Sequence, residues 1–563
     1  TATGVWAGRD AMTIPGWGPQ PPPPPPRKRR SPAKGCLFVI VGWNVVFYLV
    51  LGVVMAARWA GTHTVNPNVS ALLGWVVVLA PPVMVVRRIR RRRRRRQVAT
   101  HGDARLLPQR IASSRDPIAA VQAEARRAGG GSFIGFDEGN WVGADPQHAL
   151  LVLGPPRSGK TTSIIIPTLL SMSGPVVSTA TKPEVLAATA AVRRRLGTVW
   201  LYDPTGTEEL PDGVQALRWS PVRAARRWDG ALVMARAMVA ASPATTSHND
   251  THWSERAAAL VAPLLHAAAL DGRPVTEVVR WVLRNDLDEP GAILEDHDAE
   301  IATDVLVGIA HTHEKERSGI FSTAANVLGA YNAEGARRVA AEPNFDPEAF
   351  VRSADTVYIT AAAHLQDLAA PLVVGLLEEI RHATYARARY ASMTGTNAGP
   401  PVVFALDECA NIAPIHDLPA LVSEAGGQGL HVLACFQDLS QVRRRWGDAT
   451  ADGFLSLFVN KAILANIADS RTLEALSLAF GEYDRQVSSY SQQDQRFMAE
   501  GSTSWSLQRQ RVLPPGDIAN LPEGRVLFVQ GVRWALVQMT PWYAINPWPA
   551  VWAAASHGDA RVS

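Results

Sequence analysis

The stretch Leu150-Leu-Val-Leu-Gly-Pro-Pro-Arg-Ser-Gly-Lys-Thr161 decides the fold of this chain. Its first four residues are apolar and predict a buried strand, and the apolar run from Ser163 to Leu170 predicts the helix that follows. Between them stands the pattern Gly-x-x-x-x-Gly-Lys-Thr, whose glycines let the backbone curl around phosphate groups. The sequence therefore predicts a phosphate-binding loop (P-loop) between a strand and a helix, and with it an α/β nucleotide-binding domain.

Each part of this loop has an expected contact with ATP and Mg²⁺. Lys160 is expected to reach the β- and γ-phosphates, and the Thr161 hydroxyl is expected to bind Mg²⁺. The helix N-terminus adds its partial positive charge. A glycine turn that only mimics the pattern is the alternative, and the flanking strand and helix argue against it. The predicted nucleotide contacts are Gly154, Pro155, Pro156, Arg157, Ser158, Gly159, Lys160, Thr161 and Thr162.

A second apolar strand, predicted at 401–406, ends in the carboxylates Asp407 and Glu408. Such a strand is expected beside the P-loop strand, where Asp407 would hold Mg²⁺ through water and Glu408 would polarise the attacking water. The alternative is an acidic strand end that caps the next helix. A further strand, Leu430–Phe436, ends at Gln437, whose amide would contact the γ-phosphate or position water. A surface glutamine at a strand end is an equal alternative.

Two uncharged stretches upstream predict a transmembrane hairpin. Gly35 to Ala57 contains 23 residues, which as a helix would span about 34 Å, enough to cross a bilayer. The second stretch runs from Asn66 to Val86, and an arginine-rich run at 87–96 follows it. Basic residues on both outer flanks place both chain ends in the cytoplasm, and the arginine run is expected to anchor to anionic lipid. A buried core hairpin is the alternative, as is a signal peptide for the first span.

Charge is divided unevenly along the chain. Residues 1–100 hold 16 of the 56 Lys and Arg and one of the 51 Asp and Glu, a net charge of +15. The other 463 residues hold 40 basic and 50 acidic side chains, a net charge of −10. The basic character of the whole chain thus belongs to the predicted membrane anchor and does not make the soluble part a nucleic-acid binder. Three cysteines (Cys36, Cys409 and Cys435) have neither metal-ligand spacing nor a disulfide pattern.

Beyond the P-loop, apolar strands alternate with helical runs, which predicts a parallel α/β sheet. From about Val214 to Ala341 the periodicity is helical, for example from Trp253 to Ala269, without a convincing strand. This indicates an all-α domain inserted into the α/β domain. The polar segment 484–511 predicts a mobile loop. Further strands are expected at 175–179, 198–203 and 356–360, and a single strand-like run at 525–537.

The predicted organisation is a succession of six segments along the chain. These are a proline-rich basic tail (1–34), the transmembrane hairpin (35–96, with spans at about 35–57 and 66–86), the first part of the nucleotide-binding domain (97–213), the inserted all-α domain (214–345), the second part of the nucleotide-binding domain (346–545) and a C-terminal tail (546–563).

With these pieces in place, the chain resembles the coupling proteins of type IV secretion and conjugation systems, the TraG/TraD-like membrane ATPases. The resemblance spans roughly residues 35–540. One departure is Ala180-Thr-Lys-Pro-Glu184, where the family often has Asp-Pro-Lys-Gly-Glu, so this box receives no catalytic role. The matching motifs besides the P-loop are His101-Gly-Asp-Ala-Arg105, Leu201-Tyr-Asp-Pro-Thr-Gly206, Leu406-Asp-Glu-Cys-Ala-Asn411, Ala434-Cys-Phe-Gln-Asp-Leu-Ser-Gln441 and Asp469-Ser-Arg-Thr472.

The resemblance implies a RecA-like P-loop ATPase that forms a hexameric ring at the bacterial inner (cytoplasmic) membrane. It implies that relaxase-bound single-stranded DNA, or protein effectors, are cargo for the channel components, with the helical insert associated with cargo selection. Arg471 is the candidate arginine finger that acts in trans on the γ-phosphate of a neighbouring subunit. A role at its own helix start, or an ion pair with Glu474, is an equal alternative. Residues 443–445, three arginines, would line the pore or form a solvated helix face.

Two other functions compete with this one. A double-stranded DNA pump of the FtsK/SpoIIIE type is also membrane-anchored and RecA-like, but it is expected to carry more spans and a winged-helix tail. A membrane docking adaptor would bind nucleotide without significant turnover, and the full set Lys160, Thr161, Asp407 and Glu408 argues against it.

Overall fold

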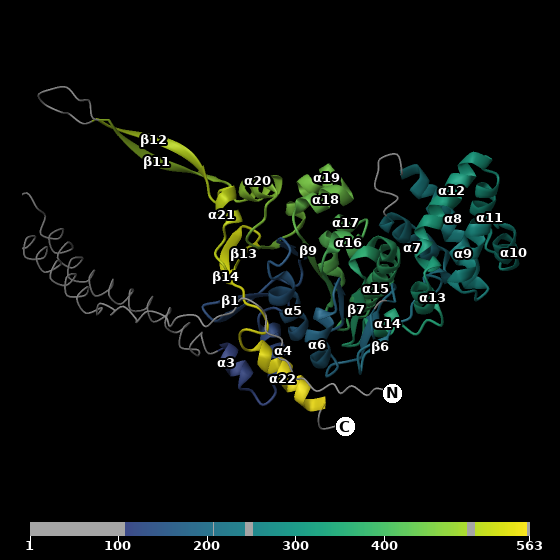
Figure 1. Ribbon diagram of the computed structural model, residues 1–563, viewed down its shortest axis with the longest axis horizontal. Helices are drawn as coiled ribbons and strands as arrows, with labels where there is room; N and C mark the ends of the chain where they lie inside the picture. The colour runs from purple at the N-terminus through teal and green to yellow at the C-terminus, as the bar shows by residue number, and fades with distance from the viewer. Residues whose placement is uncertain (1–106, 207, 243–250, 492–501, 560–563) are drawn as a thin grey trace, which may run out of the picture. The chain divides into compact units, whose positions relative to one another are not determined.

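The computed structural model describes residues 107–559 except 207, 243–250 and 492–501 (Figure 1). The predicted basic tail (1–34) and transmembrane hairpin (35–96) lie outside these residues. Among the described residues, no helix combines the length and the apolar character needed to cross a membrane. The two predicted spans therefore stay predictions.

A sheet of twelve strands forms the centre of the described part, in the order β2-β1-β14-β13-β10-β3-β9-β8-β4-β7-β5-β6. The strands from β10 to β6 are parallel, and β13, β14, β1 and β2 extend the sheet in antiparallel fashion beyond β10. The predicted α/β fold with a mostly parallel sheet is confirmed. The strands are β1 (Phe133–Asp137), β2 (Asn140–Gly143), β3 (Leu150–Leu153), β4 (Val176–Ala180), β5 (Val199–Tyr202), β6 (Gln215–Ala216), β7 (Thr356–Thr360), β8 (Val402–Leu406), β9 (Leu430–Phe436), β10 (Asn460–Ile463), β13 (Arg525–Gln530) and β14 (Arg533–Gln538).

Helices cover both faces of the sheet, which explains why its central strands β3, β9, β8, β4 and β7 are buried along their whole length. Because side chains alternate along a strand, Leu150 and Val152 of β3 join the core on one face, and Leu151 and Leu153 join the core on the other. The first face is covered by α4 (Pro117–Arg127), α5 (Ile166–Ser171), α6 (Glu184–Arg193) and α22 (Trp548–Asp559), with α3 (Leu107–Ala112) against α4 and α22. Helices that contribute to the second core are α15 (Gln366–Thr394), α16 (Cys409–Ile412), α17 (Leu418–Glu424), α18 (Leu439–Trp446), α19 (Asp448–Gly453), α20 (Ser470–Ala479) and α21 (Pro515–Ala519).

A group of helices between β6 and β7 forms the helical insert, which packs on the sheet domain through contacts between α7 and α15 (Figure 1). Trp281 is fully buried in its core. The two-residue strand β6 lies in the segment where no strand is predicted, since two residues are too few to produce a periodic pattern. The helices of the insert are α7 (Trp228–Ala241), α8 (Thr251–Leu270), α9 (Val275–Arg284), α10 (Asp288–Asp296), α11 (Glu300–Ala310), α12 (Glu314–Val327) and α13 (Glu334–Ala340), and α14 (Pro347–Phe350) leads back to the sheet.

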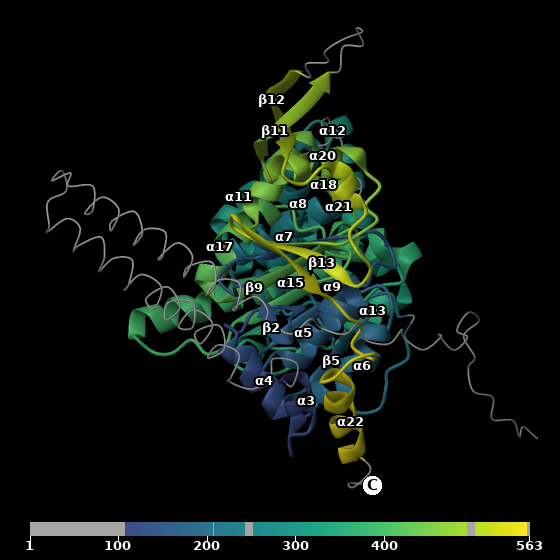
Figure 2. The same cartoon turned by 90° about the vertical axis from the view of Figure 1, so that its left-hand side faces the viewer.

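Three segments differ from their predicted form. The single run predicted at 525–537 is the hairpin β13–β14. The predicted mobile loop 484–511 contains a long ribbon, β11 (Glu482–Ser491) paired with β12 (Ser502–Arg511), which projects beyond α20 at the end opposite α22 (Figures 1 and 2). An isolated ribbon has no core face, so its sequence lacks the apolar alternation that marks a strand. The predicted C-terminal tail contains α22, whose Trp548 is fully buried beside Phe133.

Candidate nucleotide-binding site

The P-loop follows β3, Gln437 follows β9 and Asp407 follows β8. These three strands are neighbours in the sheet, in the order β3-β9-β8. Residues of β9 pair in parallel with Leu153 of β3 on one side and with Leu406 of β8 on the other. The three segments therefore meet at one edge of the sheet. The prediction that the acidic strand lies directly beside the P-loop strand is wrong, because β9 separates them. Sequence order does not give the spatial order of parallel strands, since each crossover can skip a position.

The backbone of the P-loop takes a left-handed conformation at two residues, one a glycine and one an arginine. Gly159 has φ of 93° and Arg157 has φ of 63°, both in the left-handed region. At Gly154 a Cβ atom would stand 2.7 Å from Ser158 Oγ and 2.9 Å from Leu464 Cβ. A side chain at position 154 or 159 would thus distort the loop that curls around the phosphates.

The helix after the loop starts with a π-helical segment, Thr161–Ile165, and continues as α5. Pro167 stands in the first turn of α5, lacks an N–H group, and in an α-helix would clash with the carbonyl group of Ser163. The wider π-turn accommodates this proline. The Ser163 N–H donates to the Gly159 carbonyl oxygen at 2.9 Å. The N–H groups that precede it at the helix N-terminus have no acceptor within the helix, and such groups favour an anion in the loop.

Lys160 lies inside the loop, with only 8% of its surface exposed. Its Nζ donates to the carbonyl oxygen of Pro155 at 3.0 Å and also to that of Gly154. The Ser158 Oγ is buried and has no hydrogen-bond partner in the described part of the chain. Phosphate oxygens would serve both groups, so the residues of this loop fit a nucleotide.

The remaining predicted contacts are more open. Pro156 and Arg157 are exposed, and Thr162 is half-buried with its carbonyl oxygen accepting from the Trp542 N–H at 3.0 Å. The segment after β14 thus returns to the P-loop, and Met539 Cε would lie 3.4 Å from a Cβ at Gly159. Sequence reasoning missed this segment, because nothing in its local pattern points to a site formed by residues so distant in the chain.

Asp407 and Thr161 form the part of the site that would hold Mg²⁺. The Thr161 Oγ1 donates to Asp407 Oδ2 at 2.7 Å, and the Thr179 hydroxyl donates to the Asp407 carbonyl oxygen at 3.2 Å. Burial raises the pKa of the Asp407 carboxyl group, and the Thr161 hydrogen bond and the Lys160 ammonium oppose that rise. A hydroxyl and a carboxylate oxygen are ligands that Mg²⁺ prefers, so these residues fit the ion.

Glu408 follows directly, in a left-handed conformation with φ of 51° and ψ of 48°. Such a conformation costs a non-glycine residue roughly 1–3 kcal/mol. The Asn411 Nδ2 donates to Glu408 Oε2 at 3.5 Å. Glu408 is half-buried and follows Asp407 in the chain, and among the described residues the Asn411 amide is its side-chain donor.

Gln437 is half-buried at the end of β9, and its position between β3 and β8 places it between the P-loop and the two carboxylates. Its N–H donates to Gln441 Oε1 at 2.9 Å, which fixes the backbone where strand passes into helix α18. The arrangement can present the Gln437 amide to the γ-phosphate side of a bound nucleotide.

Arg471 is exposed in the first turn of α20. The cap of this helix is Asp469, which accepts from the Thr472 N–H at 2.9 Å. Glu474 pairs with Arg511. Among the described residues, neither of the two alternative roles predicted for Arg471 within its own subunit is therefore seen.

A buried lysine within a glycine loop, a Thr–Asp pair and an adjacent glutamate at one edge of a mostly parallel sheet define a P-loop nucleotide-binding protein. The comparison with known families is more specific. The chain belongs to the family described as type IV secretory system conjugative DNA transfer, whose model matches residues 106–543. The family resemblance carried by the sequence motifs is confirmed.

Three curated relatives are similar to the chain at low identity. It is 23% identical over 447 residues to the conjugal transfer protein TraG of Agrobacterium fabrum, covering 76% of the chain and 65% of the relative. It is 24% identical over 389 residues to the TraG of Escherichia coli, covering 61% and 58%. It is 23% identical over 377 residues to the protein VirD4 of Rhizobium rhizogenes, covering 63% and 52%. The matches thus span between about half and two thirds of these relatives.

Solved structures of the bacterial conjugative coupling protein TrwB share the fold. The unbound form of TrwBΔN70 has a TM-score of 0.54 and 18% identity, covering 70% of this chain and 85% of that one. TrwB in complex with ADP and Mg²⁺ has a TM-score of 0.52 and 17% identity, covering 70% and 84%. TrwB in complex with the non-hydrolysable GTP analogue GDPNP has a TM-score of 0.52 and 18% identity, covering 70% and 86%. A fold in which α/β and helical parts combine as in TrwB is therefore established.

Proposed function

We propose that this protein is a membrane-anchored ATPase that couples ATP hydrolysis to the delivery of cargo into a conjugative type IV secretion channel. The main support for ATP hydrolysis is the hydrogen bond between Thr161 and Asp407, together with Glu408, which directly follows Asp407 in the chain. Membership of the conjugative DNA transfer family supports the delivery of cargo into the channel. The nucleotide complexes of TrwB support ATP and Mg²⁺ as ligands.

Each residue of the site has a distinct task in hydrolysis. When nucleotide binds, the Lys160 ammonium donates to phosphate oxygens in place of the loop carbonyl groups, and its positive charge offsets the negative charge of the phosphates. Thr161 and Asp407 would hold Mg²⁺, which when bound neutralises the charge on the phosphates. Glu408 accepts a proton from the attacking water, and Gln437 orients that water or the γ-phosphate. Lys160 is buried and Asp407 is half-buried, and this partial exclusion of solvent strengthens their electrostatic interactions.

The cargo in this proposal is relaxase-bound single-stranded DNA, with protein effectors as the second type of cargo. The names of the relatives, conjugal transfer protein and conjugative coupling protein, support transfer in conjugation. The family match favours this function over a double-stranded DNA pump of the FtsK/SpoIIIE type.

The test is ATP turnover by the purified protein with and without single-stranded DNA. We expect turnover that rises with single-stranded DNA of any sequence, and DNA binding that weakens steeply with salt, because phosphate contacts release counterions. With a net charge of −10 beyond residue 100, the isolated monomer should bind DNA weakly. Nucleotide binding without measurable turnover under all conditions would instead support a docking adaptor, and tight, salt-insensitive, sequence-specific binding by the monomer would contradict the DNA model.

The proposed active unit is a ring of identical subunits, hexameric in size, in which Arg471 completes the site of a neighbour. A guanidinium in trans stabilises charge that develops only in the transition state. Arg471→Ala should therefore keep nucleotide affinity and lose turnover. Mixing inactive Arg471→Ala with inactive Lys160→Ala should restore part of the activity, because some interfaces then pair an intact P-loop with an intact Arg471. Co-assembly of the two variants without any recovery would assign Arg471 a structural role.

We also propose that the chain sits in the inner membrane through a two-pass hairpin, with both ends and the ATPase domain in the cytoplasm. The uncharged stretches 35–57 and 66–86 and their arginine-rich flanks support this topology. A label applied from outside should reach only residues 58–65. Intact protein recovered in the soluble fraction would refute the anchor.

A further inference from the structure

Helix α18 connects the nucleotide site to the helical insert. It begins two residues after Gln437, and its first N–H, that of Leu439, donates to Thr472 Oγ1 at 2.9 Å. At its other end, Arg445 Nη2 donates to the carbonyl oxygen of Ala241 at 2.7 Å, at the C-terminus of α7. A cation at the C-terminus of a helix satisfies its last carbonyl groups and complements its dipole. The end of α18 is thus attached to the insert.

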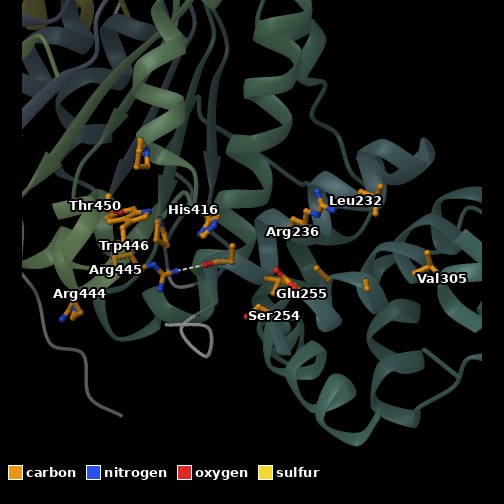
Figure 3. Close-up of a pocket in the computed structure, with 17 residues that line it drawn as sticks. Leu232, Arg236, Ser254, Glu255, Val305, His416, Arg444, Arg445, Trp446 and Thr450 are labelled. Carbon is orange, nitrogen blue, oxygen red and sulfur yellow. Dashed lines mark hydrogen bonds between the residues drawn. The ribbon is translucent and has the colours of Figure 1, made fainter. Parts of the chain in front are cut away.

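A cleft of about 940 Å³ lies between the helical insert and the sheet domain on this side. Figure 3 shows Arg444, Arg445 and Trp446 of α18 on one side and Arg236 and Glu255 of the insert on the other. Arg444 differs from its two neighbours. Its side chain is exposed and faces Asn411 instead of binding the insert.

Arg444, Asn411 and Glu408 form a chain of hydrogen bonds that leads from the cleft to the site. Arg444 Nη2 donates to Asn411 Oδ1 at 3.3 Å, and Asn411 Nδ2 donates to Glu408 Oε2 at 3.5 Å. A guanidinium can only donate and an ionised carboxylate can only accept, so these two partners fix which way the Asn411 amide points. Hydrogen bonds to catalytic groups are often long before substrate binds.

We propose that Asn411 is a positioning residue for Glu408, and that Arg444 holds the Asn411 amide in its working orientation. This inference rests on the proposed function, in which Glu408 activates water. Glu408 is a left-handed residue between strand and helix, and a glutamate side chain has several staggered rotamers, not all of which would face the γ-phosphate. A donor amide that is itself oriented restricts this freedom. Because α18 carries Arg444 next to Arg445, the orientation also depends on where the helical insert holds α18.

The experiment is steady-state ATP hydrolysis by the full-length protein carrying Asn411→Ala. We expect kcat to fall by about 10- to 100-fold, by analogy with the loss seen when a hydrogen-bond partner that orients a metal ligand is removed, with KM and nucleotide affinity unchanged. Asn411→Asp keeps the shape but loses the donor, so it should show the same loss. Asn520→Ala, an exposed asparagine in a region away from α16, is the matched control and should retain wild-type kcat.

The partner residue is tested in the same way. Arg444→Ala should lower kcat in the same direction but less, and Arg444→Lys should recover part of it because a donor remains. Arg389→Ala, an exposed arginine on α15, is the control. Unchanged kcat in both Arg444→Ala and Asn411→Ala would overturn the inference.

A double-mutant cycle separates positioning from a general structural effect. In a Glu408→Gln background, Asn411→Ala should reduce the residual turnover little further, since the carboxylate that it positions is gone. An equal loss in both backgrounds would overturn the inference. If Glu408→Gln alone leaves turnover unchanged, the role of Glu408 as the water-activating base in the proposed function fails, whatever the Asn411 variants do.

Discussion

Replacing Lys160 with alanine is expected to abolish ATP hydrolysis and to weaken nucleotide binding. Lys160 is the buried ammonium group inside the loop, and its removal leaves the phosphates without the cation that offsets their charge. The two carbonyl groups that it contacts, those of Gly154 and Pro155, also lose their donor. We therefore expect turnover at background level, measured as phosphate release by the purified protein with saturating Mg²⁺ and ATP.

The control for this variant is Lys315→Ala, which removes an exposed lysine from the helical insert. It should hydrolyse ATP like the wild type. An equal melting temperature for both variants without nucleotide would show that the loss at Lys160 is local, and protection against unfolding by added ATP should be reduced only in Lys160→Ala. Wild-type turnover by Lys160→Ala would remove the P-loop from the mechanism.

Glu408→Gln is expected to bind ATP normally and to hydrolyse it at least about a hundredfold more slowly, because the amide cannot accept the proton of the attacking water. The substitution is nearly isosteric and keeps an acceptor for the Asn411 amide, so the left-handed backbone at this position should persist. Affinity is measured with a fluorescent ATP analogue and turnover in a single-turnover experiment, which separates chemistry from product release.

Glu300→Gln, at the exposed start of α11, is the matched control. Normal hydrolysis by Glu408→Gln would show that another group activates water. Loss of ATP binding together with turnover would instead indicate that Glu408 shapes the pocket.

The sequence was sufficient to predict those parts of the site that lie next to each other in the chain. The loop from Gly154 to Thr161 directly follows one strand and directly precedes one helix. Its geometry therefore follows from residues that are adjacent in the chain. The carboxylates Asp407 and Glu408 are recognisable because an apolar strand ends in them. Parallel pairing then carries these ends to the same edge of the sheet.

The order of the strands in the sheet, and the contacts between segments far apart in the chain, could not be predicted from the sequence. The strand before Gln437 lies between those before Gly154 and Asp407, and only the crossovers of the folded chain determine this. The contact of Trp542 with Thr162 joins segments separated by hundreds of residues. The short strand β10 at Asn460–Ile463 was not predicted either, because four residues are too few to show a strand periodicity.

The three arginines at 443–445 illustrate how neighbouring residues of one type diverge in their roles. A pore lining or a solvated face was predicted for all three. Arg443 instead pairs with Asp448 at 2.8 Å, and Arg445 is bound to the last carbonyl groups of α7. Only Arg444 remains exposed. A charge run gives the number of cations but not their partners, because those partners come from other parts of the fold.

The ribbon of β11 and β12 has a consequence for where this chain can tolerate a change in length. Its strands pair in unbroken register from Glu482 opposite Arg511 to Ser491 opposite Ser502. Deleting or adding one residue on each strand leaves two directly opposed ends that a short turn can close, so the segment can be trimmed or extended pair by pair. Since none of the ribbon side chains that the structure describes belongs to either core of the sheet, such insertions and deletions should leave the site residues in place. This position can therefore accept added sequence, natural or engineered, at little cost to the ATPase domain.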